Sequence, residues 1–269
     1  MKGNGVFLLR GENDLVEMNS QDFSDEKEFQ KLIAKYPNLL AGGQIDQDNP
    51  RRWLLIEREF GLPSEEDKSD RWSIDHLFLD QEGIPTIVEV KRSSDTRIRR
   101  EVVGQMLDYA ANCVVYWPVD KLKQKLSERL SNESKYLDEE ISNFLNQQMQ
   151  PEEFWSKVDT NLKTGNIRLL FVADEIPKEL KRIVEFLNER MEPTEVLAVQ
   201  LKQYTSGDHK LLVPTIFGQT SQSEQTKQRI KKQWDYESFV DSLEKTHGIK
   251  MKNLFLKIFE WSKKTFPRQ

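Results

Sequence analysis

WSIDHLFLDQEGIPTIVEVK, residues 72–91, is the stretch of sequence that decides the fold we predict. Two runs of apolar and β-branched residues flank the turn residues DQEG, and this pattern predicts a β-hairpin. Opposed side chains in such a hairpin lie about 5 Å apart at their Cβ atoms. If the hairpin is symmetric about Glu82, Asp75 therefore lies directly opposite Glu89.

Asp75, Glu89 and Lys91 form the candidate catalytic centre. Two facing carboxylates repel each other, and a divalent cation turns that repulsion into attraction. Oxygen ligands favour Mg²⁺ or Mn²⁺, and the main-chain carbonyl of Val90 offers a third ligand. Alternate side chains of a strand share a face, so Lys91 lies beside Glu89, where its ammonium group can orient water and offset charge on a phosphoryl group. His76 lies on the face opposite Asp75, and we expect it to serve packing.

The segments around this hairpin predict an α/β fold. Helical spacing of apolar residues begins after Ser24, a plausible N-cap, and ends near Pro37. Strand patterns and a further helix then follow, at 53–60, 72–80 and 85–90, at 97–112 for the helix, and at 113–117 for the last strand. The order αβββαβ implies a mixed β-sheet flanked by helices.

The rest of the chain extends this core at both ends. Residues 5–18 resemble a hairpin, residues 119–164 are helical in pattern, and further strands are expected at 166–173, 195–204 and 210–217, with a helix at 177–190. We therefore expect an N-terminal hairpin over 1–23, a core domain over 24–217, and a linker with a C-terminal helical segment over 218–269.

Composition sets limits on function. The chain has 269 residues, of which 37% are hydrophobic and 32% charged, as in a globular protein. No apolar run approaches the roughly 20 residues of a membrane span, and the N-terminus does not resemble a secretory signal, so we expect a cytoplasmic protein without membrane contact. A single cysteine, Cys113, forms no internal disulfide. The net charge of −5 means that any contact with DNA must come from a local basic patch.

The pattern I74-D75-(x13)-E89-V90-K91 resembles the core of the PD-(D/E)xK nuclease superfamily, with isoleucine in place of the proline. Downstream, Gln105 and Tyr109 lie four residues apart on one helix face, as in the QxxxY motif of the RecB-like and NucS-like branches. The resemblance implies a restriction-endonuclease-like core and an Mg²⁺- or Mn²⁺-dependent endonuclease acting on DNA. It also implies that the glutamine and the tyrosine support the metal site and the scissile phosphate.

A further similarity concerns the first helix of the core. The segment EFQKLIAKYPNLL, residues 28–40, is similar to the helix that opens the NucS-like nuclease domain. The similarity implies that Glu28 is an additional metal ligand, and the alternative is a solvated glutamate that the helix dipole stabilises. No separate N-terminal DNA-binding domain such as that of NucS is present in this sequence, so the substrate preference of NucS is not carried over.

A local basic patch follows Lys91 in the sequence. It consists of Arg92, Arg97, Arg99 and Arg100, which we expect to hold DNA phosphates. The alternative is a solvated start of a helix. The residues leave open whether the DNA is duplex, single-stranded or branched.

Two further alternatives concern function and assembly. A catalytically silent nucleic-acid-binding or assembly module could keep the same fold, although such a module has no reason to retain all the motif residues. The C-terminal segment carries a broad apolar stripe that needs a partner surface, made of Leu254, Phe255, Ile258, Phe259 and Trp261. That partner is either the core domain or a second copy of the chain, and we favour a homodimer.

Overall fold

The computed structural model describes residues 5–63, 70–95, 101–220 and 236–265. The chain divides into two compact units, Met1–Ser223 and Glu224–Gln269, and each is described by itself. The first unit carries the sheet and all the predicted site residues. None of the helices in the described ranges is long and apolar enough to cross a membrane.

The predicted hairpin is formed by β4 (Asp70–Leu79) and β5 (Pro85–Lys91). The strands pair from Leu79 opposite Pro85 to His76 opposite Val88, which is the register expected from symmetry about Glu82. Asp80 closes the turn, because its side chain accepts hydrogen bonds from the main-chain N–H groups of Glu82 and Ile84. The expected register is therefore confirmed.

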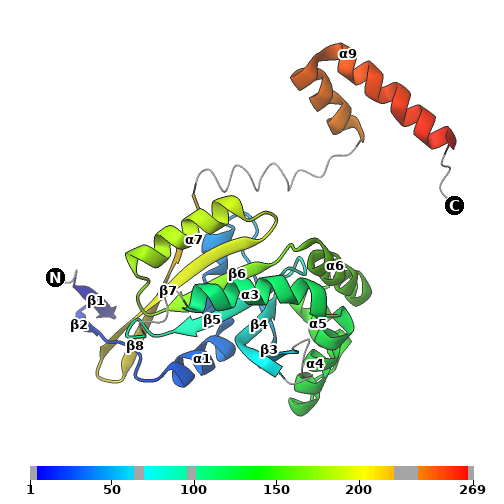
Figure 1. Cartoon of the computed structure of the whole chain (residues 1–269). Coiled ribbons are helices and arrows are strands. Elements are labelled where there is room, and N and C mark those ends of the chain that lie inside the picture. The colour runs from blue at the N-terminus through cyan, green and yellow to red at the C-terminus, as the bar shows by residue number, and fades with distance from the viewer. Residues whose placement is uncertain (1–4, 64–69, 96–100, 221–235, 266–269) are drawn as a thin grey trace. The chain divides into compact units, whose positions relative to one another are not determined.

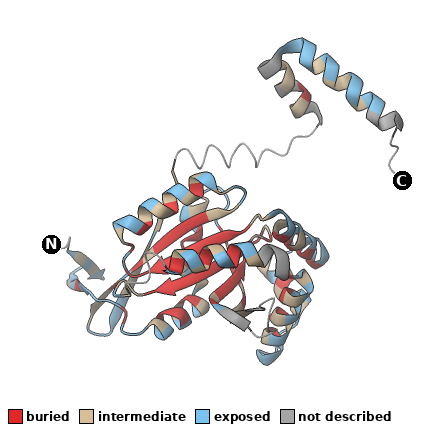
Figure 2. Cartoon of the chain, in the orientation of Figure 1, coloured by how far each residue is buried: buried red, intermediate tan, exposed pale blue. Residues whose placement is uncertain are grey.

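The hairpin belongs to an eight-stranded mixed sheet. The other strands are β1 (Val6–Arg10), β2 (Asp14–Ser20), β3 (Leu54–Pro63), β6 (Arg168–Ala173), β7 (Glu195–Ser206) and β8 (His209–Phe217). Their order is β1-β2-β7-β6-β5-β4-β3, and β8 pairs with β7. Strands β5, β6 and β7 run parallel, and every residue of β5 and β6 is buried, as expected for parallel strands with both faces covered. Figure 2 shows this burial in the centre of the sheet.

Helices cover both faces of the sheet (Figure 1). One face packs against α1 (Glu26–Lys35), the 3₁₀ helix η1 (Pro37–Leu40) and α2 (Gly42–Ile45). The other face packs against α3 (Glu101–Tyr116), α4 (Val119–Asn132), α5 (Leu137–Phe144), α6 (Pro151–Thr164) and α7 (Lys178–Arg190). The predicted α/β class, with a mixed sheet between helices, is confirmed.

One predicted strand is wrong. The segment expected as a strand at 113–117 continues α3, which ends at Tyr116. Val and Tyr favour strands, but a short apolar run does not distinguish a strand from a buried helix by periodicity alone. The strand that follows α3 in the sheet is β6, after three intervening helices. The N-cap of α1 is also Asp25 and not Ser24.

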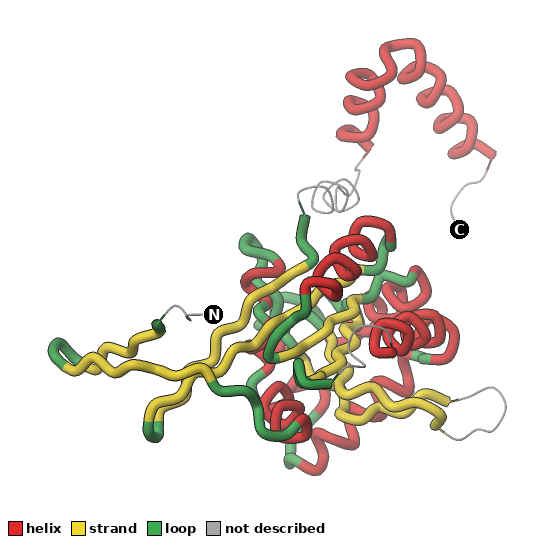
Figure 3. Tube along the Cα trace, turned by 60° about the vertical axis from the view of Figure 1, so that its left-hand side comes forward, coloured by secondary structure: helices red, strands yellow, loops and turns green. Residues whose placement is uncertain are grey.

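The predicted N-terminal hairpin exists and joins the same sheet. Strands β1 and β2 pair in register from Val6 opposite Met18 to Arg10 opposite Asp14. The last two residues of β2 pair with β7, at Asn19 opposite Thr205 and Ser20 opposite Tyr204. Figure 3 shows the hairpin projecting from one end of the sheet.

The second unit contains the helical segment α9 (Tyr236–Thr265). Gly248 has φ 78 and ψ 170, which interrupts the helix and separates two shorter helices. The two pack through Phe239 and Phe255, whose ring centroids lie 4.8 Å apart, and through an ion pair of 2.6 Å between Lys252 and Glu244. The predicted C-terminal helical segment is confirmed.

Candidate active site

The candidate site lies where the pairing of β4 with β5 ends. The last paired residues are His76 and Val88, one position before Asp75 and Glu89. There the Asp75 carboxylate accepts a hydrogen bond of 2.7 Å from the main-chain N–H of Val90. Its other oxygen accepts one of 2.7 Å from the side-chain amide of Gln30 on α1. The Asp75 carboxylate is therefore held from both sides, beside β5.

Glu89 is buried with one oxygen unsatisfied. The residue is 5% exposed, and its Oε1 lies 3.0 Å from Nζ of Lys91. Its Oε2 is buried and has no hydrogen-bond partner among the described residues. Burial, and then the charge of Asp75, raise the pKa of Glu89 to about 7. Burial also raises the pKa of Asp75, against the opposing charge of Lys91. The pair is therefore costly to ionise without a further cation.

The ammonium group of Lys91 lies among the oxygen atoms of the site. Its Nζ lies 3.0 Å from Oε1 of Glu26, 3.0 Å from Oε1 of Glu89, 3.1 Å from the carbonyl oxygen of Val90 and 3.8 Å from Oδ2 of Asp75. Burial works to lower the pKa of Lys91, but the charges of Glu89 and Asp75 outweigh it and the pKa is raised. The ammonium group therefore stays charged at neutral pH.

The oxygens around Lys91 fit a hard divalent cation. The described residues contain no group of three or more His, Cys, Asp or Glu side chains arranged to hold a metal ion. A cation here would instead take the carboxylates of Asp75 and Glu89, the carbonyl of Val90 and water, as Mg²⁺ often does. The unsatisfied, buried Oε2 of Glu89 is the observation that favours this fit, because buried polar atoms normally have partners.

The helix α1 contributes Glu26 and Gln30 to the site, and not the predicted Glu28. Glu28 is exposed and accepts a hydrogen bond of 2.9 Å from the hydroxyl of Ser24. This places it in the role of the alternative interpretation, a solvated glutamate at the start of the helix. The sequence does carry a signal for Gln30, since it is a polar residue next to Phe29 on the buried face of the helix.

Tyr109 reaches the site from α3, whereas Gln105 makes no hydrogen bond to the described residues of the site. Tyr109 is 2% exposed, and its hydroxyl donates a hydrogen bond of 3.1 Å to the carbonyl of Ser73 on β4. Burial raises its pKa, and the charges of Glu89 and Asp75 add to the rise, which places the phenol near both carboxylates. Gln105 is half-buried, and within the described part of the chain its amide has no hydrogen bond.

The predicted basic patch is described only in part. Arg92 is half-buried, directly after Lys91, and its Nε is buried without a hydrogen-bond partner among the described residues. The loop that follows is fixed by the N–H of Ser93, which donates to Asp174 at the end of β6. The other three arginines, at positions 97, 99 and 100, lie outside the described residues.

His76 serves packing, as expected. It is fully buried, and its Nε2 lies 2.8 Å from the carbonyl oxygen of Gln30. Burial lowers its pKa to about 4, so the ring is neutral at physiological pH. The histidine therefore joins α1 to β4 beside the candidate site.

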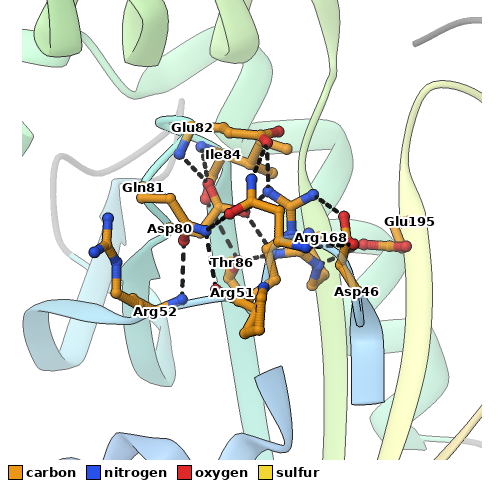
Figure 4. Close-up of polar contacts among 12 residues, drawn as sticks. Asp46, Arg51, Arg52, Asp80, Gln81, Glu82, Ile84, Thr86, Arg168 and Glu195 are labelled. Carbon is orange, nitrogen blue, oxygen red and sulfur yellow. Dashed lines mark hydrogen bonds and ion pairs between the residues drawn. The ribbon is translucent and has the colours of Figure 1, made fainter. Parts of the chain in front are cut away.

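A second buried polar cluster occupies the other end of β5, near the hairpin turn (Figure 4). Arg168 lies 3.1 Å from Asp80 and also pairs with Glu195, while Arg51 pairs with Glu82 at 2.8 Å. Burial works to lower the pKa of Arg168, but the two carboxylates raise it, so the guanidinium stays charged. These ion pairs tie together the starts of β5, β6 and β7. We assign them a structural role.

Comparison with protein-family models, with curated proteins and with solved structures finds no match to this chain. The function is therefore argued from the motif residues and from the geometry of the site.

Proposed function

We propose that this protein is a metal-dependent nuclease of the PD-(D/E)xK type, which hydrolyses phosphodiester bonds in DNA. The observation that carries the proposal is the convergence of Asp75, Glu89 and Lys91 where two paired strands separate, with one carboxylate oxygen left unsatisfied. Mg²⁺ or Mn²⁺ bound there would supply Lewis-acid stabilisation of the phosphoryl group and activation of water.

Each residue has a role that its contacts support. The Asp75 and Glu89 carboxylates and the Val90 carbonyl would hold the cation. Lys91 keeps its positive charge, so its ammonium group can offset the negative charge that builds on the phosphoryl oxygens. Glu26 contacts that ammonium group at 3.0 Å and positions it.

Other residues hold the catalytic centre in place and do not bind the cation. Tyr109 holds the β4 backbone at Ser73 through its hydroxyl, and Gln30 holds the Asp75 carboxylate. Arg92 directly follows Lys91, where a guanidinium can hold a DNA phosphate. Action on DNA agrees with the expected cytoplasmic location.

The second candidate is a catalytically silent module that binds nucleic acid or assists assembly. The observation that favours it is the ammonium group of Lys91, which contacts Glu26 and Glu89 and so compensates the buried carboxylates without a metal. Under this alternative, stability alone explains the five motif residues, which are Asp75, Glu89, Lys91, Gln105 and Tyr109. Neither Mg²⁺ nor Mn²⁺ then supports cleavage.

We also propose that the second unit joins two copies of the chain. Met251, Leu254 and Ile258 are 45%, 52% and 54% exposed, and their spacing of three and four residues is that of a helix packing seam. A pair of short helices has too little core to bury such a seam within itself. A second copy offers the same seam, and a twofold dimer is the commonest assembly.

The experiment is cleavage of end-labelled single-stranded and duplex DNA by the full chain with Mg²⁺ or Mn²⁺, and with excess EDTA. We expect metal-dependent cleavage that Asp75→Asn and Lys91→Ala abolish, whereas Glu152→Gln, at an exposed position on α6, keeps the wild-type rate. Full cleavage in EDTA, or a wild-type rate for Lys91→Ala, would refute the mechanism. Absence of cleavage with either metal would favour the silent module.

A further inference from the structure

An open groove of about 560 Å³ lies between α1, β3 and α4. Five of the side chains that line it are cationic and three are acidic, in a chain whose net charge is −5. A local basic surface on an acidic protein is the arrangement expected for binding a polyanion at one place.

The acidic side chains of the groove form ion pairs with two of its cations. Lys125 lies 3.2 Å from Glu57 and 3.9 Å from Glu128. Arg129 lies 2.6 Å from Glu133 and also donates a hydrogen bond of 2.7 Å to a main-chain carbonyl of β3. These pairs shape the α4 wall, where two cations face three carboxylates. Glu133 pairs with Lys135 as well, at 3.0 Å.

The opposite wall keeps its positive charge. Among the described residues, no carboxylate lies within ion-pair distance of Lys31, Lys35 or Arg58, and the Nε of Arg58 is buried without a hydrogen-bond partner. Both lysines are exposed and lie four residues apart on α1, which spaces them by roughly 6 Å along the helix axis. The groove therefore presents three cations that have no acidic partner in the described part of the chain.

This row of cations begins beside the candidate active site. Lys31 follows Gln30, whose amide donates to the Asp75 carboxylate. On β3, Arg58 pairs in register with His76, the neighbour of Asp75 on β4. A strand whose phosphate sits at the candidate active site therefore meets these cations within a few nucleotides.

An exposed aromatic ring lies at the far end of the row. Tyr36, which caps the C-terminus of α1, is 50% exposed. The Nζ of Lys35 lies 5.2 Å from the centroid of its ring. Single-strand binding proteins combine a cationic groove that follows the backbone with aromatic rings on which unpaired bases stack. The bases of a duplex are already stacked and paired, so the ring can accept only a base from a single strand.

We propose that the groove binds the phosphodiester backbone of single-stranded DNA, with Lys31, Lys35 and Arg58 on the phosphates and one base stacked on Tyr36. The inference rests on the proposed function, which places the cut at the candidate active site. It adds that the substrate is single-stranded DNA. The strand runs from the candidate active site along α1 into the groove.

Binding of fluorescent oligonucleotides to the full chain tests the proposal. Anisotropy is measured in EDTA, which prevents metal-dependent cleavage, with a single strand and with the duplex of the same sequence. The single strand should bind more tightly, and Lys31→Ala/Lys35→Ala should weaken its binding about tenfold or more. Loss of two contacts should also reduce the slope of log K against log salt by roughly 1.4.

Two further variants separate stacking from general charge. Tyr36→Leu should weaken single-strand binding about fivefold or more while leaving the salt slope unchanged, because stacking involves no phosphate. The matched control is Lys202→Ala/Lys210→Ala, which removes two exposed lysines from the β7–β8 pair, and its affinity should equal that of the wild type. Equal melting temperatures show that the variants fold.

Three results would overturn the inference: tighter binding of the duplex, no measurable binding of the single strand, or wild-type affinity and salt slope in both groove variants. Its failure is distinct from that of the proposed function. Binding that depends on the groove, without cleavage in Mg²⁺ or Mn²⁺, supports the groove and removes the nuclease. Cleavage in Mg²⁺ or Mn²⁺, with DNA binding that the groove variants do not weaken, supports the nuclease and refutes the role of the groove.

Discussion

Replacing Glu89 by glutamine should stabilise the metal-free protein at pH 8 and have little effect at pH 5. The Glu89 carboxyl is 5% exposed, and burial with the nearby charge of Asp75 raises its pKa from 4.5 to about 7. Below about pH 4.5 the carboxyl is protonated in both the folded and the unfolded chain. As the pH rises toward 7, the unfolded chain loses this proton first, so the folded state becomes less stable.

The size of the effect follows from this difference in pKa. Each pKa unit corresponds to about 1.4 kcal/mol, so ionised Glu89 costs the folded state roughly 3 kcal/mol at pH 8 and less than about 1 kcal/mol at pH 5. A neutral amide of the same shape avoids this cost. For a domain of this size, about 3 kcal/mol corresponds to roughly 6 to 12 °C in melting temperature.

The assay is thermal unfolding of wild type and Glu89→Gln in EDTA at both pH values, with the exposed Glu152→Gln as control. We expect the variant to melt higher than wild type at pH 8 and nearly equal to it at pH 5, and the control to match wild type at both. Two results would refute the raised pKa of the buried Glu89 carboxyl. The first is a variant that melts lower than wild type at pH 8, and the second is a variant that melts higher than wild type by the same margin at both pH values.

Three other predictions concern the positioning residues and assembly. Tyr109→Phe removes the hydroxyl that holds Ser73, and single-turnover cleavage should slow by on the order of 10 to 1000-fold at saturating Mg²⁺; an unchanged rate would remove the tyrosine from the site. Glu26→Gln should lower turnover about tenfold and Glu28→Gln should not, and the reverse result would restore Glu28 as the site residue. Leu254→Glu with Ile258→Glu should give a monomer by light scattering where the wild type gives a dimer; a wild-type monomer contradicts the seam.

The hairpin register could be predicted from the sequence because two independent patterns agree on it. Alternation along the strands and the position of the turn both place Glu82 at the centre, so the pairing of His76 with Val88 follows. The strand expected at 113–117 failed because its apolar, β-branched residues suit a strand as well as a buried helix.

The choice between Glu26 and Glu28 shows a different limit. Two positions on a helix differ by about 200° in direction, so Glu26 and Glu28 point to nearly opposite sides of α1. The expectation for Glu28 rests on a resemblance of sequence, whereas the contact of Glu26 with Lys91 depends on how α1 packs against the sheet.

The charged cluster around Arg168 and the groove could not be predicted at all. Their residues come from segments far apart in the sequence, such as Arg51 with Glu82, and Lys31 with Arg58. No local spacing relates them, because the topology of the sheet alone brings them together.

The metal centre is the claim on which the proposed mechanism depends, and it can be tested directly by diffraction. Crystals of the protein soaked in Mn²⁺ are measured at a wavelength where manganese scatters anomalously. The account predicts an anomalous peak between the carboxylates of Asp75 and Glu89 and the carbonyl of Val90, and its loss in crystals of Asp75→Asn. No peak at these three residues in the wild type, or an undiminished peak in the variant, would contradict it.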